Sequence, residues 1–132
     1  MLAMPLTFMN LSGVAVSALV KKYKIDLNDL LIVCDDLDLE FGRLKIKPRG
    51  SSAGHRGINS IINSLVSKDF ARLRMGIGRP RKSQRTSDYV LSRFNRKEGA
   101  QLKNILNAAC DCCRTWISQG IDKSMNIFNQ KE

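Results

Sequence analysis

Three acidic residues follow one apolar segment of the chain. Leu30-Leu-Ile-Val-Cys34 is a short, uninterrupted apolar run, and Asp35, Asp36 and Asp38 come directly after it. In open α/β sheets, functional groups gather beyond the carboxyl ends of the strands. Three carboxylates there could bind Mg²⁺, act as general acid or base, or orient a histidine. A solvated acidic turn explains the same residues equally well.

A second segment is rich in backbone donors. Gly50-Ser-Ser-Ala-Gly-His-Arg-Gly57 precedes an apolar helical pattern, so His55 and Arg56 stand where that helix would begin. Free amides at such a point bind anions, and the segment could cradle a phosphate. The P-loop order of residues is absent, and the glycines and serines could serve only a tight turn. A single histidine here is more typical of a structural role than of a general base.

Basic residues indicate a polyanionic partner. The net charge is +10, and residues 67–132 hold 14 basic side chains against 6 acidic ones. Nucleic acid is the commonest partner of such a field, although a solubilising surface is the alternative. Aromatic residues are only 6%, which favours recognition of folded RNA by backbone and shape over base stacking. The candidate phosphate-binding residues are Lys45, Lys47, Arg72, Arg74, Arg79, Arg81, Lys82 and Arg85.

An amide side chain lies near the start of the chain. Thr7-Phe-Met-Asn-Leu-Ser-Gly13 places Asn10 between an apolar segment and a helical pattern. A carboxamide can donate and accept at once, so Asn10 could hold a peptide backbone. A helix-capping role for Asn10 or Ser12 fits the same residues.

Alternating strand and helix patterns predict a single α/β domain. Apolar runs and period-two alternation indicate strands, and apolar residues three or four apart indicate helices. Basic side chains would point outward from two of the strands, at Arg43, Lys45 and Lys47 and at Arg72 and Arg74. We expect strands at 2–8, 30–34 (covered on both faces), 44–47 and 72–78, a short apolar element at 89–91, and helices at 14–24, 58–65, 96–119 and beyond Gly120.

Several classes of protein are disfavoured. No apolar run approaches the roughly 20 residues that span a bilayer, and the first residues do not have the pattern of a secretory signal. The cysteines are Cys34, Cys110, Cys112 and Cys113, whose spacing suits neither a disulfide framework nor paired zinc ligands. Reduced thiols are typical of an intracellular compartment.

Five segments in this order closely resemble bacterial-type peptidyl-tRNA hydrolases. They are Pro5-Leu-Thr-Phe-Met-Asn-Leu-Ser-Gly13, Val33-Cys-Asp-Asp-Leu-Asp-Leu39, Gly54-His-Arg-Gly57, Phe70-Ala-Arg-Leu-Arg-Met-Gly-Ile-Gly-Arg-Pro80 and Tyr89-Val-Leu91. The resemblance implies one α/β domain over residues 1–132, with a twisted mixed β-sheet flanked by helices. It also implies hydrolysis of the ester between a peptide and tRNA, without a metal or cofactor, by a monomer in the cytoplasm or an organelle.

The resemblance also assigns site residues. It implies that Asp35 orients a catalytic histidine. By the same resemblance, Phe8, Asn10 and Arg56 contact the substrate, and Lys45, Lys47 and Arg74 hold tRNA phosphates. Two residues depart from the family pattern: Cys34, where many members have histidine or another residue, and Arg56, where many have asparagine.

The family's catalytic histidine lies in a segment that precedes the part matched here. The resemblance therefore implies that these 132 residues are the C-terminal two-thirds of the family domain, lack its N-terminal strand and are weak or inactive alone. Two alternatives remain: a non-catalytic RNA-binding paralogue similar to splicing factors, and a Mg²⁺-dependent phosphoesterase that uses Asp35, Asp36 and Asp38.

Overall fold

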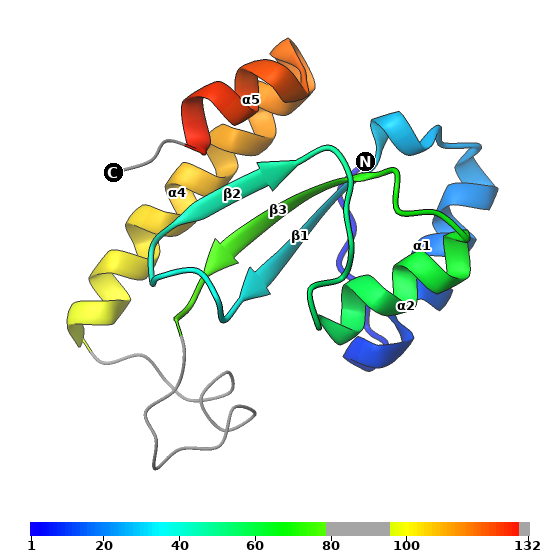
Figure 1. Ribbon diagram of the computed structural model, residues 1–132, viewed down its shortest axis with the longest axis horizontal. Helices are drawn as coiled ribbons and strands as arrows, with labels where there is room; N and C mark the ends of the chain where they lie inside the picture. Colours follow the sequence, from blue (N-terminus) through cyan, green and yellow to red (C-terminus); the bar gives the residue numbers. More distant parts are fainter. Residues whose placement is uncertain (79–95, 130–132) are drawn as a thin grey trace. The chain divides into compact units, whose positions relative to one another are not determined.

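The computed structural model describes residues 1–78 and 96–129 and confirms the α/β class (Figure 1). The short apolar element expected at 89–91 and the basic residues at 79–85 lie outside the described residues. The regular elements are the short 3₁₀ turns η1 (Met9–Leu11) and η2 (Leu27–Asp29), the strands β1 (Leu31–Asp36), β2 (Leu44–Lys47) and β3 (Ala71–Gly76), and the helices α1 (Ser12–Tyr23), α2 (Arg56–Leu65), α4 (Arg96–Gln119) and α5 (Ile121–Phe128).

The three strands form one mixed sheet in the order β1-β3-β2. The amide of Ala71 donates to the Leu30 carbonyl at 3.2 Å, and the amide of Ile77 donates to the Asp36 carbonyl at 3.1 Å. This constant offset makes β1 and β3 parallel, whereas β2 runs in the opposite direction (Figure 1). The predicted mixed sheet is therefore confirmed.

Two expectations about the strands are wrong. We expected the first apolar strand to be covered on both faces, but Val33 is 48% exposed, and β1 lies at an edge of the sheet that residues 1–78 and 96–129 form. We also expected a strand within residues 2–8. This segment has no regular secondary structure, and Leu2 and Leu6 are almost fully exposed.

The central strand β3 corrects a third expectation. Period-two alternation predicted that Arg72 and Arg74 point to solvent, yet they are 0% and 7% exposed. A central strand is flanked on both sides and is covered more completely than an edge strand, so its polar side chains must find partners inside the protein. Both guanidinium groups have such partners.

The chain divides into two compact units, the first formed by residues 1–32 and 48–72. Its helices α1 and α2 pack closely where Gly13 meets Ser60. The Gly13 amide donates to Ser60 Oγ at 2.9 Å, and a Cβ at Gly13 would collide with the Ser60 carbonyl oxygen. Glycine is thus required at this contact, which fixes the start of α1 against α2. Val16, Ile58 and Ile61 are buried in this unit.

The second unit comprises residues 33–47 and 73–132. In it α5 packs against β2 and α4 packs against α5, as Figure 1 shows. Ile46 and Cys112 are fully buried, which confirms β2 as a strand with one apolar face. The predicted bounds of the long helix are confirmed as α4, and Gly120 separates α4 from α5 with a φ of 87°. None of the helices in the described part of the chain has the length and apolar character needed to cross a membrane.

Candidate functional site

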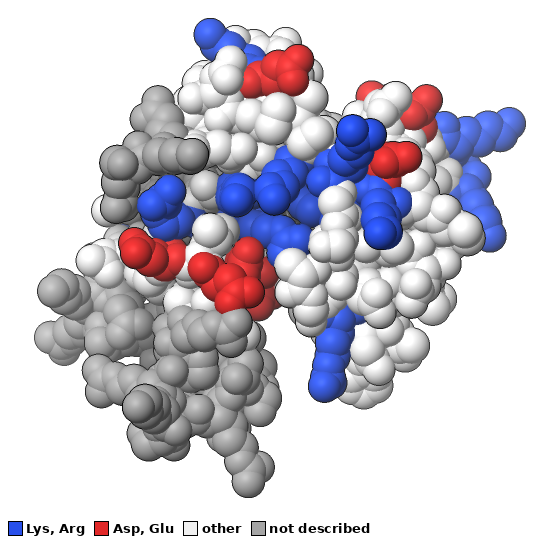
Figure 2. Space-filling model, viewed as in Figure 1, with Lys and Arg blue, Asp and Glu red and all other residues white. Residues whose placement is uncertain are grey.

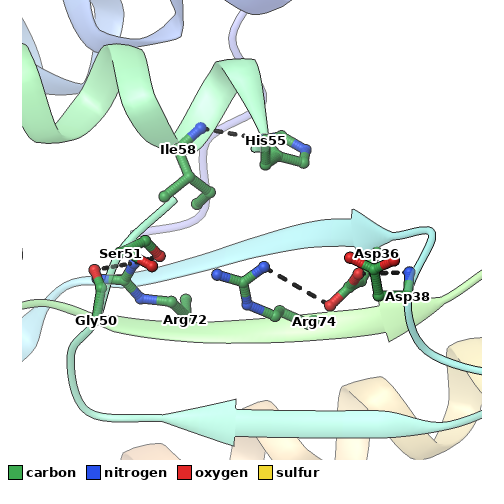
Figure 3. Close-up of polar contacts among 8 residues, drawn as sticks. All are labelled: Asp36, Asp38, Gly50, Ser51, His55, Ile58, Arg72 and Arg74. Carbon is green, nitrogen blue, oxygen red and sulfur yellow. Dashed lines mark hydrogen bonds and ion pairs between the residues drawn. The ribbon is translucent and has the colours of Figure 1, made fainter. Parts of the chain in front are cut away.

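Three acids at and just beyond the end of β1, Asp35, Asp36 and Asp38, form what we call the acidic corner. Asp36 Oδ1 accepts a hydrogen bond from the Asp38 amide at 2.8 Å, and Asp36 Oδ2 lies 3.6 Å from Arg74 Nη1 (Figure 3). Asp36 therefore stabilises the turn that ends β1. Because successive strand residues point to opposite faces, Asp35 points to the face of the sheet away from the Asp36–Arg74 pair.

Asp35 is half-buried, whereas Asp38 is exposed. Among residues 1–78 and 96–129, no three His, Cys, Asp or Glu side chains gather as metal ligands would. In the acidic corner, Asp36 thus pairs with Arg74, and the neighbouring Asp35 is directed to the other face of the sheet.

The Gly- and Ser-rich segment is held by a side chain that the sequence did not single out as structural. Arg72 Nη1 donates to the carbonyls of Gly50 at 2.7 Å and Ser51 at 3.1 Å, and Nη2 donates to those of Lys68 at 2.8 Å and Phe70 at 3.2 Å. Its guanidinium also lies 4.4 Å from the centre of the Phe70 ring. One buried cation therefore fixes the segment that leads into α2 (Figure 3).

His55 caps α2. Its Nδ1 accepts a hydrogen bond from the Ile58 amide at 3.1 Å, as an N-cap side chain does. This contact fits the structural interpretation of His55. Arg56, the first residue of the helix, is exposed.

The segment with Phe8 and Asn10 lies in the same unit as Arg56. Phe8 is 81% exposed, and Asn10 lies in η1, which packs against α2. A Cβ on Gly57 would lie 2.6 Å from Met9 Sδ, so the η1 turn touches the first turn of α2. The structure thus places the segment that carries Phe8 and Asn10 against α2, the helix that begins with Arg56.

The capping interpretation of Asn10 is wrong. Neither η1 nor α1 has a side-chain N-cap. Ser12 instead donates its hydroxyl to the Met9 carbonyl at 2.8 Å. The Asn10 side chain is exposed, which leaves its carboxamide accessible to a ligand.

The expected phosphate-binding residues divide into two groups. Lys45 and Lys47 are exposed on β2 on either side of the buried Ile46, which confirms the predicted basic face of this strand. Arg74 is buried at its contact with Asp36. On the face drawn in Figure 2, Lys and Arg side chains lie at the surface with fewer Asp and Glu side chains among them.

All four cysteines are free thiols. Cys112 is fully buried in α4, and burial, with a smaller effect of Cys113, raises its pKa to about 11. Burial also raises the pKa of Cys113. These thiols are protonated at neutral pH and belong to the packing of α4.

The structure is that of an α/β protein with a mixed sheet. It has carboxylates at the end of β1 and exposed lysines on β2. A family model described as peptidyl-tRNA hydrolase matches residues 1–132. The chain therefore belongs to the peptidyl-tRNA hydrolase family.

Individual relatives agree with this membership. A protein of Desulforudis audaxviator named peptidyl-tRNA hydrolase is 48% identical over 128 residues, which are 97% of this chain and 64% of that protein. One of Sulfurihydrogenibium sp. with the same name is 47% identical over 129 residues, covering 98% and 68% of the two chains. The crystal structure of peptidyl-tRNA hydrolase from Acinetobacter baumannii matches with a TM-score of 0.85 at 30% identity, over 97% of this chain and 65% of that one. The chain thus spans about two thirds of the length of these relatives.

Proposed function

We propose that this chain takes part in hydrolysis of the ester bond of peptidyl-tRNA, which releases the peptide and free tRNA. The observation that carries the proposal is the 48% identity to a peptidyl-tRNA hydrolase across 97% of the chain. The half-buried Asp35 at the carboxyl end of β1 supports it, because functional groups of α/β sheets gather there.

Ester hydrolysis requires a base that activates water and a dipole that stabilises the oxyanion. We propose that Asp35 orients the imidazole that acts as this base. His55 is the one histidine of the sequence, and its Nδ1 is engaged in capping α2. Following the resemblance to the family, we propose that the imidazole belongs to a segment other than these 132 residues.

Substrate contacts are proposed for Phe8, Asn10 and Arg56. The exposed Asn10 carboxamide can donate to a carbonyl oxygen and accept from an amide of the peptide. The exposed Phe8 ring offers an apolar surface to a side chain or base. Arg56, at the start of α2, offers a charged donor where the helix amides already favour anions.

The tRNA backbone is proposed to bind Lys45 and Lys47, which are both exposed on β2. The resemblance implies the same contact for Arg74. Since Arg74 is 7% exposed and lies 3.6 Å from Asp36, we propose that it supports binding by holding the turn after β1. The protein acts as a monomer in the cytoplasm or an organelle and without a metal ion.

The proposal is tested by release of the acyl group from an N-blocked aminoacyl-tRNA. The assay compares the 132-residue chain with the same chain joined to the N-terminal third of the Desulforudis audaxviator relative. The joined protein is expected to turn over, and the shorter chain to be slower by at least about 100-fold, the usual contribution of a general base. Asp29→Asn, an exposed acid in η2, is the matched control for substitutions at Asp35.

Other outcomes favour other functions. A joined protein that folds and binds tRNA but releases no acyl group supports an RNA-binding paralogue. Release that stops when a chelator removes Mg²⁺ supports a metal-dependent reaction at the acidic corner. Rapid turnover by the 132-residue chain alone contradicts the need for an external imidazole.

A further inference from the structure

The side chain of Asn129 binds the backbone of the strand that carries the exposed lysines. Asn129 is the C-cap residue of α5. The Ile46 amide donates to Asn129 Oδ1 at 2.7 Å, and Asn129 Nδ2 donates to the Ile46 carbonyl at 2.7 Å. One carboxamide therefore satisfies both polar backbone groups of one strand residue.

This contact replaces a missing neighbouring strand. β2 is an edge strand of the described sheet, so one row of its amides and carbonyls has no strand beside it. Unpaired backbone groups cost free energy when they are shielded from water, and Ile46 is fully buried. Asn129 supplies a donor and an acceptor in the arrangement that another strand would offer. Since β2 has only four residues, a single such contact fixes a large part of it.

The residue held by Asn129 lies between Lys45 and Lys47. Both lysines are exposed, whereas Ile46 points into the core. Residues two apart on a strand point the same way and lie about 7 Å apart. With the backbone held at Ile46, the two lysine side chains start from a fixed stretch of backbone, and less backbone freedom is lost when they meet phosphates.

We propose that Asn129 is a positioning residue for tRNA binding, which holds β2 so that Lys45 and Lys47 meet neighbouring phosphates. This inference rests on the proposed function, in which these lysines contact tRNA. It requires a carboxamide at position 129, because this group offers a donor atom and an acceptor atom side by side, as the amide and carbonyl of one strand residue require.

The test is a double-mutant cycle that measures the affinity for deacylated tRNA by fluorescence anisotropy over a range of KCl concentrations. The variants are Asn129→Ala, the Lys45→Ala/Lys47→Ala pair and the three changes together. Asn126→Ala is the matched control, since Asn126 is an exposed asparagine on the same helix. Asn129→Asp, compared with Asn126→Asp, is a second pair that keeps side-chain size and removes the donor.

We expect the effect of Asn129→Ala on tRNA affinity to depend on the presence of Lys45 and Lys47. Asn129→Ala weakens binding by about 5-fold in the parent chain and by less than about 1.5-fold once both lysines are absent, as for residues that act together. Removal of the lysines lowers the slope of log affinity against log salt by about one for each lysine. Asn126→Ala leaves both quantities unchanged.

Two results overturn the inference in distinguishable ways. If Asn129→Ala weakens binding equally with and without the lysines, or no more than Asn126→Ala does, Asn129 does not act through them. If the Lys45→Ala/Lys47→Ala chain binds tRNA as the parent does, the proposed tRNA contact itself fails and the inference fails with it. Should Asn129→Ala not fold, as judged by circular dichroism, the Asn129→Asp and Asn126→Asp pair gives the same comparison.

Discussion

Asp36 at the end of β1 and Arg74 on the neighbouring strand β3 form an ion pair of 3.6 Å with side chains that are 14% and 8% exposed. Asp36 also accepts a hydrogen bond from the Asp38 amide. The pair thus ties the acidic corner to the central strand. We therefore assign Asp36 a structural role at the end of β1.

Breaking this pair from one side should destabilise the fold. Arg74→Met leaves a shielded carboxylate, and Asp36→Asn leaves a shielded guanidinium, so each should lower the free energy of unfolding by about 3 kcal/mol. The double variant should cost less than the sum of the two, since neither charge is then left alone. Urea unfolding measures the free energy of unfolding of the two single variants and the double variant.

Arg114→Ala is the control, because its pair with Asp111 is 77% and 66% exposed and should contribute less than about 1 kcal/mol. Additive effects of the two buried changes would contradict this account of the pair.

Arg72→Lys should destabilise the protein although it keeps the charge. The guanidinium reaches four carbonyl groups from two separate segments, and a single ammonium cannot match that arrangement. Lost partners for shielded carbonyls should lower the free energy of unfolding by about 2–4 kcal/mol. Arg49→Lys, on an exposed side chain, should change it by less than about 0.5 kcal/mol. Equal stability of the two variants would show that the four hydrogen bonds contribute little.

Two glycine substitutions should have opposite effects. A Cβ on Gly13 would meet the Ser60 carbonyl oxygen, so Gly13→Ala should force α1 and α2 apart and cost about 1–3 kcal/mol. No atom lies within 4 Å of a Cβ built on Gly99, which is in α4. Gly99→Ala should therefore stabilise the chain by about 0.5–1 kcal/mol through helix propensity. Thermal unfolding compares both with the parent, and destabilisation by Gly99→Ala would contradict the prediction.

The buried thiol of Cys112 predicts a loss of stability at high pH. Burial raises its pKa from 9.0 to about 11. Between these values the unfolded chain releases the proton while the folded chain keeps it, so the free energy of unfolding falls as pH rises. The difference in unfolding free energy between the parent and Cys112→Ala should shrink from pH 8 to pH 11, because the substitution removes this titration. A difference that stays constant over this interval would mean that Cys112 ionises in the folded protein as easily as in the unfolded one.

The sequence predicted best those helices and strands whose buried and exposed faces follow from the order of apolar and polar residues within the segment itself. Apolar residues three or four apart in 96–119 predicted α4, and alternation of apolar and basic residues in 44–47 predicted β2. The strand positions could not be derived in the same way. Whether a strand is central or at an edge depends on pairing between distant segments, which is why Val33 proved exposed and Arg72 buried.

The sequence predicted only those parts of the candidate site whose charged residues stand out by type and spacing. The acidic corner and the lysines of β2 stand out from the sequence, and their strands were predicted. The residue types alone do not show which of the adjacent acids pairs with Arg74, and the structure identifies it as Asp36. The contact between Asn129 and Ile46 joins residues 83 positions apart and has no local signal.

The most direct measurement is a steady-state comparison of Asp35→Asn with the parent, both as the joined protein, on an N-blocked aminoacyl-tRNA. If Asp35 orients the catalytic imidazole, kcat should fall by at least about 100-fold while the Kd for tRNA changes by less than about 2-fold. Lys45→Ala/Lys47→Ala should show the reverse, with weaker binding and a nearly unchanged kcat. An unchanged kcat in Asp35→Asn, or a parallel loss of binding and rate in both variants, would contradict the assignment of this carboxylate.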